Sequence, residues 1–366
     1  GKTQKEVAQK LKQAVYELDQ GTYQAPCRMT VKDWLETWKA EYTGDVKPST
    51  AYIYKKNLDM YVSPFLGAVK LEALTAPMVQ SLYNRLLKPE KEGDPALSAK
   101  SIRNVHGVFH KALEQAVLVG YIRVNPTDAC KPPKAGKKEL SPLDEVHVAA
   151  FLTAIKEHSH EYLYKIAMFT GLREGEVLGL TWDCLDLERG TLLVKQQLRR
   201  EQQKGGTYYM DSTKNGKCRV LALAPSVVRL FRCQKLKQNG MRVKAGELWT
   251  EHDLVFTNEV GGYLSYRTVY DCFKRLMVKI GSPDTRFHDL RHTYAVLAIK
   301  SGDDIKTVQE NLGHATAAFT LDVYGHVTAQ MRRDSADRME QVIQSMSAGE
   351  IFLPGNKAKN KAKTCF

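Results

Sequence analysis

The sequence predicts a mainly helical protein with a small antiparallel β-sheet, an α+β fold in two domains. Three observations lead to this prediction. Apolar residues recur at three- and four-residue spacing through most of the chain, as they do on one face of a helix. Short alternating stretches, typical of strands, gather between residues 192 and 223. A lysine- and proline-rich segment at residues 131–140 has the composition of an extended linker and places the domain boundary there.

Composition and charge favour a folded protein with a polyanionic partner. The 366 residues are 43% hydrophobic and 26% charged, which argues against a disordered or fibrous chain. Lysine and arginine number 54 against 41 acidic residues, a formal net charge of +13. Such an excess suits nucleic acid or an anionic membrane surface. No apolar run approaches the roughly 20 residues that span a membrane, so nucleic acid is the favoured partner.

Cysteine usage and the N-terminus indicate where the protein works. The seven cysteines are scattered and never form a Cys-x-x-Cys pair, so we expect neither a disulfide framework nor a zinc ribbon. A reducing cytoplasm fits this pattern best. The first residues carry charge where a signal peptide needs an apolar core, and they predict a helix already under way. We expect residues 1–28 to be the remnant of a preceding domain and its connector.

Residues 29–130 are predicted to form a bundle of four helices. Apolar periodicity marks the helices Val31–Tyr42, Ser49–Tyr61, Ala76–Leu87 and Ala99–Val119. The second helix has a start signal, because Pro48 cannot extend a preceding helix and Ser49 or Thr50 can cap the first turn. Basic residues on the solvated faces would suit DNA phosphates, although the same residues are ordinary surface on many proteins. These residues are Lys55, Lys56, Lys100, Arg103 and Lys111.

Residues 141–347 are predicted to form the second domain. Helices are expected at Ser141–His158, at Glu161–Phe169 and from Ser226 onward, with strands at Leu192–Gln197, Tyr208–Asp211 and Arg219–Leu223. The Asn215-Gly216 pair favours a two-residue hairpin turn, which would place Lys214 at a hairpin tip. The lysine-rich residues 348–366 are of low complexity, and we expect them to be disordered.

Four separated groups of residues in the second domain need a common explanation. They are Arg173 with Glu176, Lys214, the run Phe287–His292, and Leu312-Gly313-His314 followed by Tyr324. Taken singly, each group has a structural explanation: a helical ion pair, a solvated turn lysine, structural histidines and a half-buried aromatic ring. Their combination in this order favours a functional explanation.

In this order the groups resemble the catalytic signature of the tyrosine recombinase (phage integrase) family. The run Gly171–Glu176 resembles the first-arginine box of that family, and Lys214 resembles its β-hairpin lysine. His288-x-x-Arg291 is similar to the second box, Leu312-Gly-His314 to the third, and Tyr324 to the nucleophile. None of the expected positions is substituted.

The resemblance covers the catalytic half, 141–347, and implies a helical core-DNA-binding domain at 29–130. The opening Gly1–Glu6 resembles the connector that follows the arm-binding domain in integrases of conjugative transposons. The implied function is site-specific cleavage and rejoining of DNA through a 3′-phosphotyrosyl intermediate, for integration and excision of a mobile element. The implied partners are double-stranded DNA, further copies of the chain in a tetrameric synapse, and an excision accessory protein.

Phosphodiester transfer explains why these donors belong together. The reaction passes through a state with extra negative charge on the nonbridging oxygens, which fixed donors stabilise. Arg173 and Arg291 are the candidates, because a guanidinium offers paired N–H donors and stays protonated. On one helix, His288 and Arg291 would share a face and reach one phosphate. We assign His314 as a further phosphate donor and Glu176 as the residue that orients an arginine.

The remaining roles concern protons and the nucleophile. Lys214 is the expected general acid for the departing 5′ oxygen, and His288 accepts the tyrosine proton or donates to phosphate. Tyr324 has an unperturbed pKa near 10, so it attacks only when it is positioned and surrounded by positive charge. The phosphotyrosyl bond keeps the ester energy, so we expect no metal, no ATP and no other cofactor.

The same residues are compatible with other functions. His288 and His292 stand four residues apart as zinc ligands do, but the glutamate base of a metalloprotease is absent and a cation lies between them. A purely DNA-binding protein would explain the charge but not the four groups. A type IB topoisomerase uses similar residues and is the alternative enzyme. Recombination is favoured by a predicted helix after Tyr324, which packs on its own chain or docks on a neighbour; its apolar residues are Met331, Ala336, Met339, Val342, Ile343 and Met346.

Overall fold

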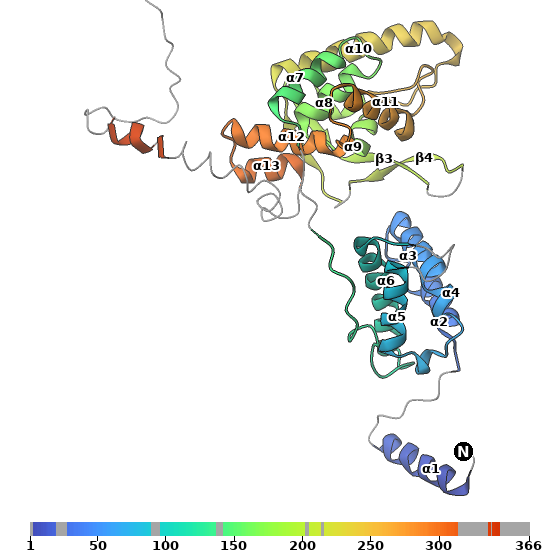
Figure 1. Ribbon diagram of the computed structural model, residues 1–366. Helices are drawn as coiled ribbons and strands as arrows, with labels where there is room; N and C mark the ends of the chain where they lie inside the picture. The colour runs from blue at the N-terminus through green and yellow to red at the C-terminus, as the bar shows by residue number, and fades with distance from the viewer. Residues whose placement is uncertain are drawn as a thin grey trace, which may run out of the picture. The chain divides into compact units, whose positions relative to one another are not determined.

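The computed structural model divides the chain into two compact units near residue 138, each with its own hydrophobic core (Figure 1). The described residues are 3–19, 28–88, 96–136, 142–201, 205–213, 216–313, 336–337 and 339–344. Within these ranges no helix is long and apolar enough to cross a membrane. The five cysteines described there are free thiols.

The first unit is helical, and the four predicted helices are confirmed to within one residue at each end. In chain order its elements are α1 Gln4–Asp19, α2 Val31–Glu41, α3 Pro48–Tyr61, α4 Ser63–Leu66, the 3₁₀ turn Leu71–Ala73, α5 Ala76–Leu87 and α6 Ala99–Leu118. Trp34 of α2 is fully buried, and its indole N–H donates to the Ala112 carbonyl of α6 at 2.8 Å. This bond and the apolar faces around it join helices α2 through α6 into one bundle, whose core contains no described side chain of α1.

The start of α3 differs from the prediction. Pro48 is itself the first helical residue, Lys47 stands at the N-cap, and no side chain caps the helix. The expected cap by Ser49 or Thr50 is therefore wrong. Proline suits the first turn because its fixed φ is already helical and the N–H that it lacks would have no partner there. By contrast, Thr30 caps α2 by accepting from the Asp33 N–H at 3.2 Å.

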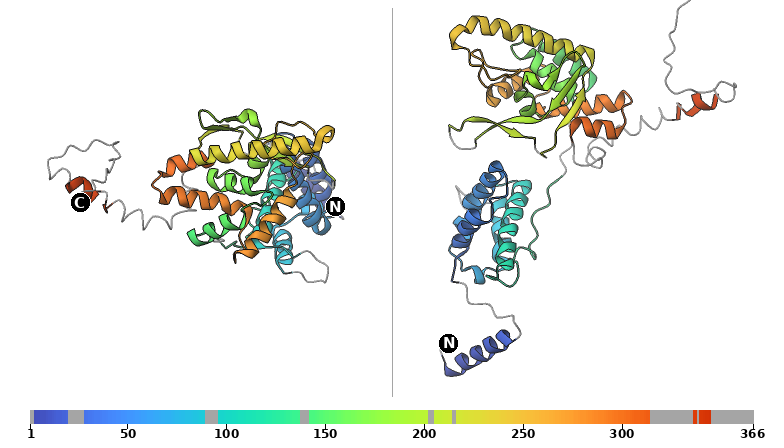
Figure 2. Two further views of the ribbon diagram at one scale, coloured as in Figure 1. Left: turned by 90° about the horizontal axis from the view of Figure 1, so that it is seen from above. Right: turned by 180° about the vertical axis from the view of Figure 1, so that it is seen from behind.

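The second unit combines helices with short strands (Figures 1 and 2). Its elements are α7 Glu145–Ala154, α8 Glu161–Thr170, α9 Glu174–Leu178, the 3₁₀ turn Trp182–Cys184, β1 Leu185–Asp186, β2 Thr191–Val194, β3 Gln196–Arg200, β4 Tyr208–Ser212, β5 Arg219–Ala222, α10 Pro225–Ala245, the 3₁₀ turn Gly246–Leu248, α11 Tyr266–Lys279, α12 Phe287–Lys300 and α13 Ile305–Leu312. Helix α7 is shorter than predicted, because Asp144 caps it by accepting from the His147 N–H.

The strands form two antiparallel sheets rather than one. Strand β2 lies between β1 and β5, while β3 pairs only with β4 among the described residues. The predicted strand Leu192–Gln197 therefore spans the end of β2 and the start of β3. Burial explains the pairing of β2 with β5, because Leu192 and Leu221 lie opposite each other and both face the core.

This arrangement corrects the expected hairpin at Lys214. The strands on either side of it, β4 and β5, belong to different sheets, so they do not form a two-residue hairpin. A turn is nevertheless present, because the Gly216 N–H donates to the Thr213 carbonyl at 2.9 Å. Gly216 has the positive φ, +67°, expected of the Asn-Gly pair. Lys214 and Asn215 lie outside the described residues.

Candidate active site

The first-arginine box begins where α8 ends. Gly171 caps α8 with a φ of +64°, and a Cβ on it would lie 2.5 Å from the Tyr294 ring and 2.8 Å from the Leu312 side chain. Only glycine lets the chain turn here against α12 and α13. The turn delivers Arg173 to the N-cap of α9, where its backbone N–H donates to Glu176 Oε2 at 2.9 Å.

The Glu176 carboxylate is the centre of the site. Its side chain is 1% exposed and accepts from two guanidinium groups. Arg173 Nη1 lies 2.7 Å from Oε1, and Arg219 of β5 binds both oxygens, at 3.0 Å and 2.6 Å. Burial alone would raise the pKa of Glu176, but the hydrogen bonds and charges of Arg219 and Arg173 lower it to about 2. Glu176 is therefore an ionised carboxylate inside the fold.

Three arginines converge on the C-terminal end of α13. Arg219 Nε donates to the Asn311 carbonyl at 2.8 Å, and Arg173 Nη2 donates to the Gly313 carbonyl at 3.1 Å. Arg291 Nη2 donates to the Leu312 carbonyl between them. The last carbonyls of a helix lack intrahelical partners and carry the negative end of its dipole, so cations are stabilised there. The carbonyls of residues 311–313 are thus held by three cations, from β5, from the N-cap of α9 and from α12.

Helix α12 carries the second box and lies beside α13 (Figures 1 and 2). Arg291 is 1% exposed and also donates to the Gly171 carbonyl at 2.8 Å, so it ties α12 to the first box. His288 is exposed, and its ring lies edge-on to the buried His292 with centroids 4.9 Å apart. Burial lowers the pKa of His292 to about 4. Loss of water around the His288 ring, followed by the charges of His292 and Arg291, lowers the pKa of His288 as well. Both rings are neutral near pH 7.

The structure brings together three of the predicted residues, Arg173, Glu176 and Arg291. His288 stands one turn from Arg291 on α12, but the two differ in exposure. Lys214, His314 and Tyr324 lie outside the described residues, although Gly313 immediately precedes His314. The predicted DNA-contact residues are exposed on α3 and α6 of the first unit; they are Lys55, Lys56, Lys100 and Arg103.

Arg219 belongs to this site although the sequence pattern does not single it out. It opens an alternating strand, where an arginine is normally solvated, and its partner Glu176 is distant in the chain. The sequence feature that could have indicated Arg219 as a site residue is its position five residues after Lys214. The one described group of three side chains that could hold a metal ion lies elsewhere, in the first unit: His110, Glu114 and Asp128.

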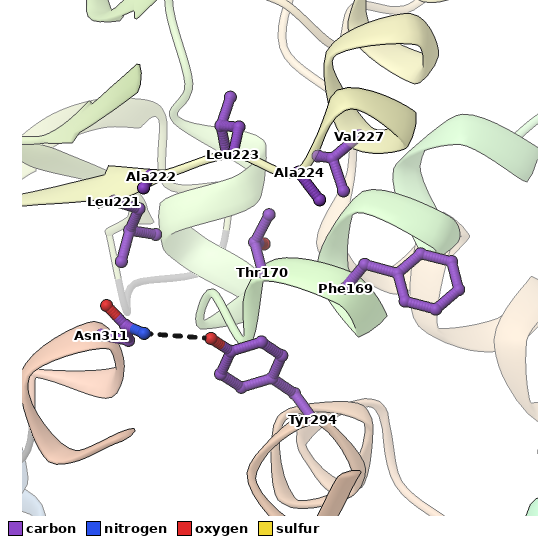
Figure 3. Close-up of a pocket in the computed structure, with 9 residues that line it drawn as sticks. All are labelled: Phe169, Thr170, Leu221, Ala222, Leu223, Ala224, Val227, Tyr294 and Asn311. Carbon is purple, nitrogen blue, oxygen red and sulfur yellow. Dashed lines mark hydrogen bonds between the residues drawn. The ribbon is translucent and has the colours of Figure 1, made fainter. Parts of the chain in front are cut away.

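A recess beside the site is lined by α8, β5, α10, α12 and α13 (Figure 3). Across it, the Asn311 side-chain amide donates to the Tyr294 hydroxyl at 3.3 Å. Most of the other lining is apolar, for example Leu221 and Val227. None of the predicted site residues lines this recess, so the candidate active site is the arginine cluster and not the recess.

Glu176→Gln should lower the free energy of unfolding at pH 7 by roughly 3 kcal/mol, because the pKa of Glu176 falls from 4.5 to about 2 on folding. A carboxylate whose pKa is lower in the folded chain than in the unfolded chain stabilises the fold at pH values above its unfolded pKa. The difference in unfolding free energy between variant and wild type should therefore be largest above pH 4.5 and should shrink as the pH falls towards 2. Denaturant titrations at several pH values measure it. Glu188→Gln, at an exposed ion pair, is the control and should change little; a pH-independent difference at Glu176 would contradict the assignment.

Comparison with known proteins agrees with this geometry. The phage integrase family model matches residues 142–331, and the phage integrase N-terminal SAM-like domain matches residues 30–87. A tyrosine recombinase XerC-like protein of Caldanaerobacter subterraneus subsp. tengcongensis is 26% identical over 94% of this chain and 91% of its own.

Solved structures have the same fold. An integrase of transposon Tn1549, solved with transposon right-end DNA, aligns with a TM-score of 0.71 at 23% identity over 85% of this chain and 100% of that one. A lambda integrase tetramer bound to a Holliday junction aligns with a TM-score of 0.58 at 20% identity, over 89% of each chain. The family match spans more than half of the chain and includes the arginine cluster. The chain therefore belongs to the phage integrase family and is a tyrosine recombinase.

Proposed function

We propose that this recombinase transfers a DNA strand to the hydroxyl of Tyr324, with Arg173 and Arg291 binding the scissile phosphate. The observation that supports this most is the convergence of the two guanidinium groups on the Leu312 and Gly313 carbonyls, directly before His314. Donors fixed by the fold need no reorganisation when negative charge develops on the phosphate.

The proton transfers follow from the neighbouring groups. The lowered pKa of His288 leaves its ring neutral, so it accepts the Tyr324 proton as the tyrosyl oxygen attacks phosphorus. The bond between phosphorus and the 5′ oxygen breaks, and Lys214 gives that oxygen its proton. His314 donates to the phosphate. One phosphoester replaces another, so the step needs neither ATP nor a metal ion, and the reverse reaction rejoins the strand.

Binding of double-stranded DNA involves the first unit in this proposal. Its exposed basic residues on α3 and α6 suit contacts with phosphates, which position a protein on the duplex. The Tn1549 and lambda integrases described above were solved with DNA. The resulting enzyme integrates and excises a mobile element on the bacterial nucleoid, with an accessory protein assisting excision.

Assembly into a tetrameric synapse is the second part of the proposal. Residues 339–344 are helical, and Met339 and Ile343 are 59% and 51% exposed in the single chain. Their four-residue spacing places both on one face, which a neighbouring subunit would cover. The lambda integrase tetramer supports such an assembly, and the relatives described above carry the names of recombinases, so the topoisomerase alternative has no support among them.

Tyr324→Phe should abolish covalent attachment to a nicked duplex while DNA affinity stays nearly unchanged, because only the hydroxyl is lost. The duplex is selected from a randomised pool by covalent capture with the wild-type chain. Denaturing gels count the covalent complex, and Tyr270→Phe on α11 is the control. A covalent complex that persists in Tyr324→Phe would assign the nucleophile to another residue.

Lys214→Ala should slow cleavage by about 10²- to 10⁴-fold, the range for loss of a general acid. A 5′-thio leaving group needs no protonation, so it should restore the rate of Lys214→Ala. Arg173→Ala should lose about 10²- to 10³-fold with either leaving group, because its role is on the phosphate. Single-turnover cleavage measures all four rates, and equal rescue of both variants would remove the assignment of Lys214.

The double substitution Met339→Ser with Ile343→Ser should weaken the complex on two DNA sites and slow recombination, while single-site binding stays intact. The reason is that the apolar face is buried only in the assembly. Native gels and a recombination assay measure these effects. Val243→Ser on α10, 83% exposed, is the control. Unchanged assembly in the double variant would refute docking through this face.

A further inference from the structure

We infer that Arg219 is a positioning residue for strand transfer: it holds Glu176 and the end of α13 together, and it thereby fixes Arg173 and the backbone of residues 311–313, which directly precede His314 in the sequence. The inference rests on the proposed roles of Arg173 and His314. Arg219 is not among the residues that the sequence signature contains, and it comes from β5, which carries none of the three boxes.

The contacts of Arg219 engage all three nitrogens of its guanidinium group. Nη1 and Nη2 bind the two oxygens of Glu176, at 3.0 Å and 2.6 Å, while Nε donates to the Asn311 carbonyl at 2.8 Å. Only 11% of the side chain is exposed, so these bonds form away from bulk water, where charge-assisted bonds are strong. Each of the three nitrogens of Arg219 therefore binds a protein acceptor, and together these bonds link β5 to Glu176 and to the end of α13.

Arg219 acts on the side chain of Arg173 through a carboxylate oxygen of Glu176 that both arginines bind. Oε1 of Glu176 accepts from Arg219 Nη1 and from Arg173 Nη1, at 3.0 Å and 2.7 Å. The two-pronged bond from Arg219 fixes the plane of the carboxylate, and that plane sets the direction from which Arg173 can bind. Without Arg219 the carboxylate keeps only its two bonds from Arg173, from the backbone N–H to Oε2 and from Nη1 to Oε1, so no group outside the first box fixes the orientation of the Arg173 side chain. Small displacements of this kind in a positioned donor cost up to about 10²-fold in rate.

The effect on the third box is equally direct. Asn311 accepts from Arg219 through its carbonyl and donates to Tyr294 through its side-chain amide, so the last turn of α13 is held from two sides. Gly313 has a φ of +64°, and a Cβ there would lie 3.2 Å from both Cδ and Nη1 of Arg219. The glycine that precedes His314 therefore also leaves the room that the Arg219 side chain occupies.

Lysine cannot replace this arrangement. A guanidinium group is a planar fork that can bind a carboxylate with two nitrogens and still direct its Nε–H to a carbonyl. An ammonium group keeps the charge but is a single point, so it can hold Glu176 or Asn311 but not both in this geometry. The lysine variant therefore separates the charge of Arg219 from its positioning role.

The experiment measures covalent cleavage in a single turnover at saturating DNA, with the full chain and the nicked duplex captured by the wild type. Arg219→Ala should cleave about 10- to 100-fold more slowly, with a DNA dissociation constant within about twofold of wild type. Arg219→Lys should recover only part of the rate. Arg232→Ala, which removes an exposed arginine paired with Glu188, is the matched control and should not change the rate.

A double-mutant cycle distinguishes positioning from general structural support. If Arg219 acts mainly through Arg173, adding Arg219→Ala to Arg173→Ala should cost about threefold or less, far below its effect in the wild type. Thermal melting accompanies every variant, and if Arg219→Ala fails to fold, the same cycle with Arg219→Lys decides. A wild-type rate for the Arg219 variants, or a fully additive loss, would overturn the inference. Failure of the proposed function would look different, because cleavage would then not depend on Tyr324.

Discussion

The ion pair between the buried Glu176 carboxylate and two guanidinium groups is the constraint on which the site depends. Arg173 and Arg219 could not lie side by side in a partly desolvated place without an anion between them, because unpaired buried charge is costly. The carboxylate compensates part of that charge, and the carbonyls of α13 add partial negative charge. Arg291 binds the same end of α13 through the Leu312 carbonyl, so the cluster holds three guanidinium charges and the single carboxylate of Glu176, an excess of positive charge that suits a phosphate.

The same constraint explains why elements distant in sequence meet here. The end of α8, the start of α9, strand β5, helix α12 and the end of α13 are each tied to another through an arginine or Glu176. Helix α9 must also approach β3 closely, since a Cβ at Gly179 would lie 2.4 Å from the Leu198 nitrogen. Packing therefore places the first-arginine box, and the ion pairs then set the directions of its side chains.

Local patterns predicted the helices well because periodicity and caps act over a few residues, as in α2, α5 and α6. They failed at Pro48, where a start signal was assigned to the wrong residue, and at Leu192–Gln197, where one apparent strand spans two sheets. Strand pairing depends on which faces are buried, which a short alternating stretch does not specify. The family resemblance predicted Arg173, Glu176 and Arg291. It did not predict Arg219, because the role of Arg219 depends on Glu176, which is distant in the sequence and lies beside it only in the folded chain.

All the groups of the arginine cluster belong to the second unit, so their ion pairs form when that unit folds and require neither DNA nor a partner chain. The side chains of the cluster therefore lose their conformational entropy during folding and not when DNA binds. Donors prepared in this way stabilise charge in the transition state more effectively than donors that must first be ordered. If Arg173 and Arg291 have their proposed roles, the groups that bind the phosphate are therefore already in place in the folded chain. Control by assembly would act on the other part of the reaction, the segment that carries Tyr324 and continues into the exposed helical residues 339–344.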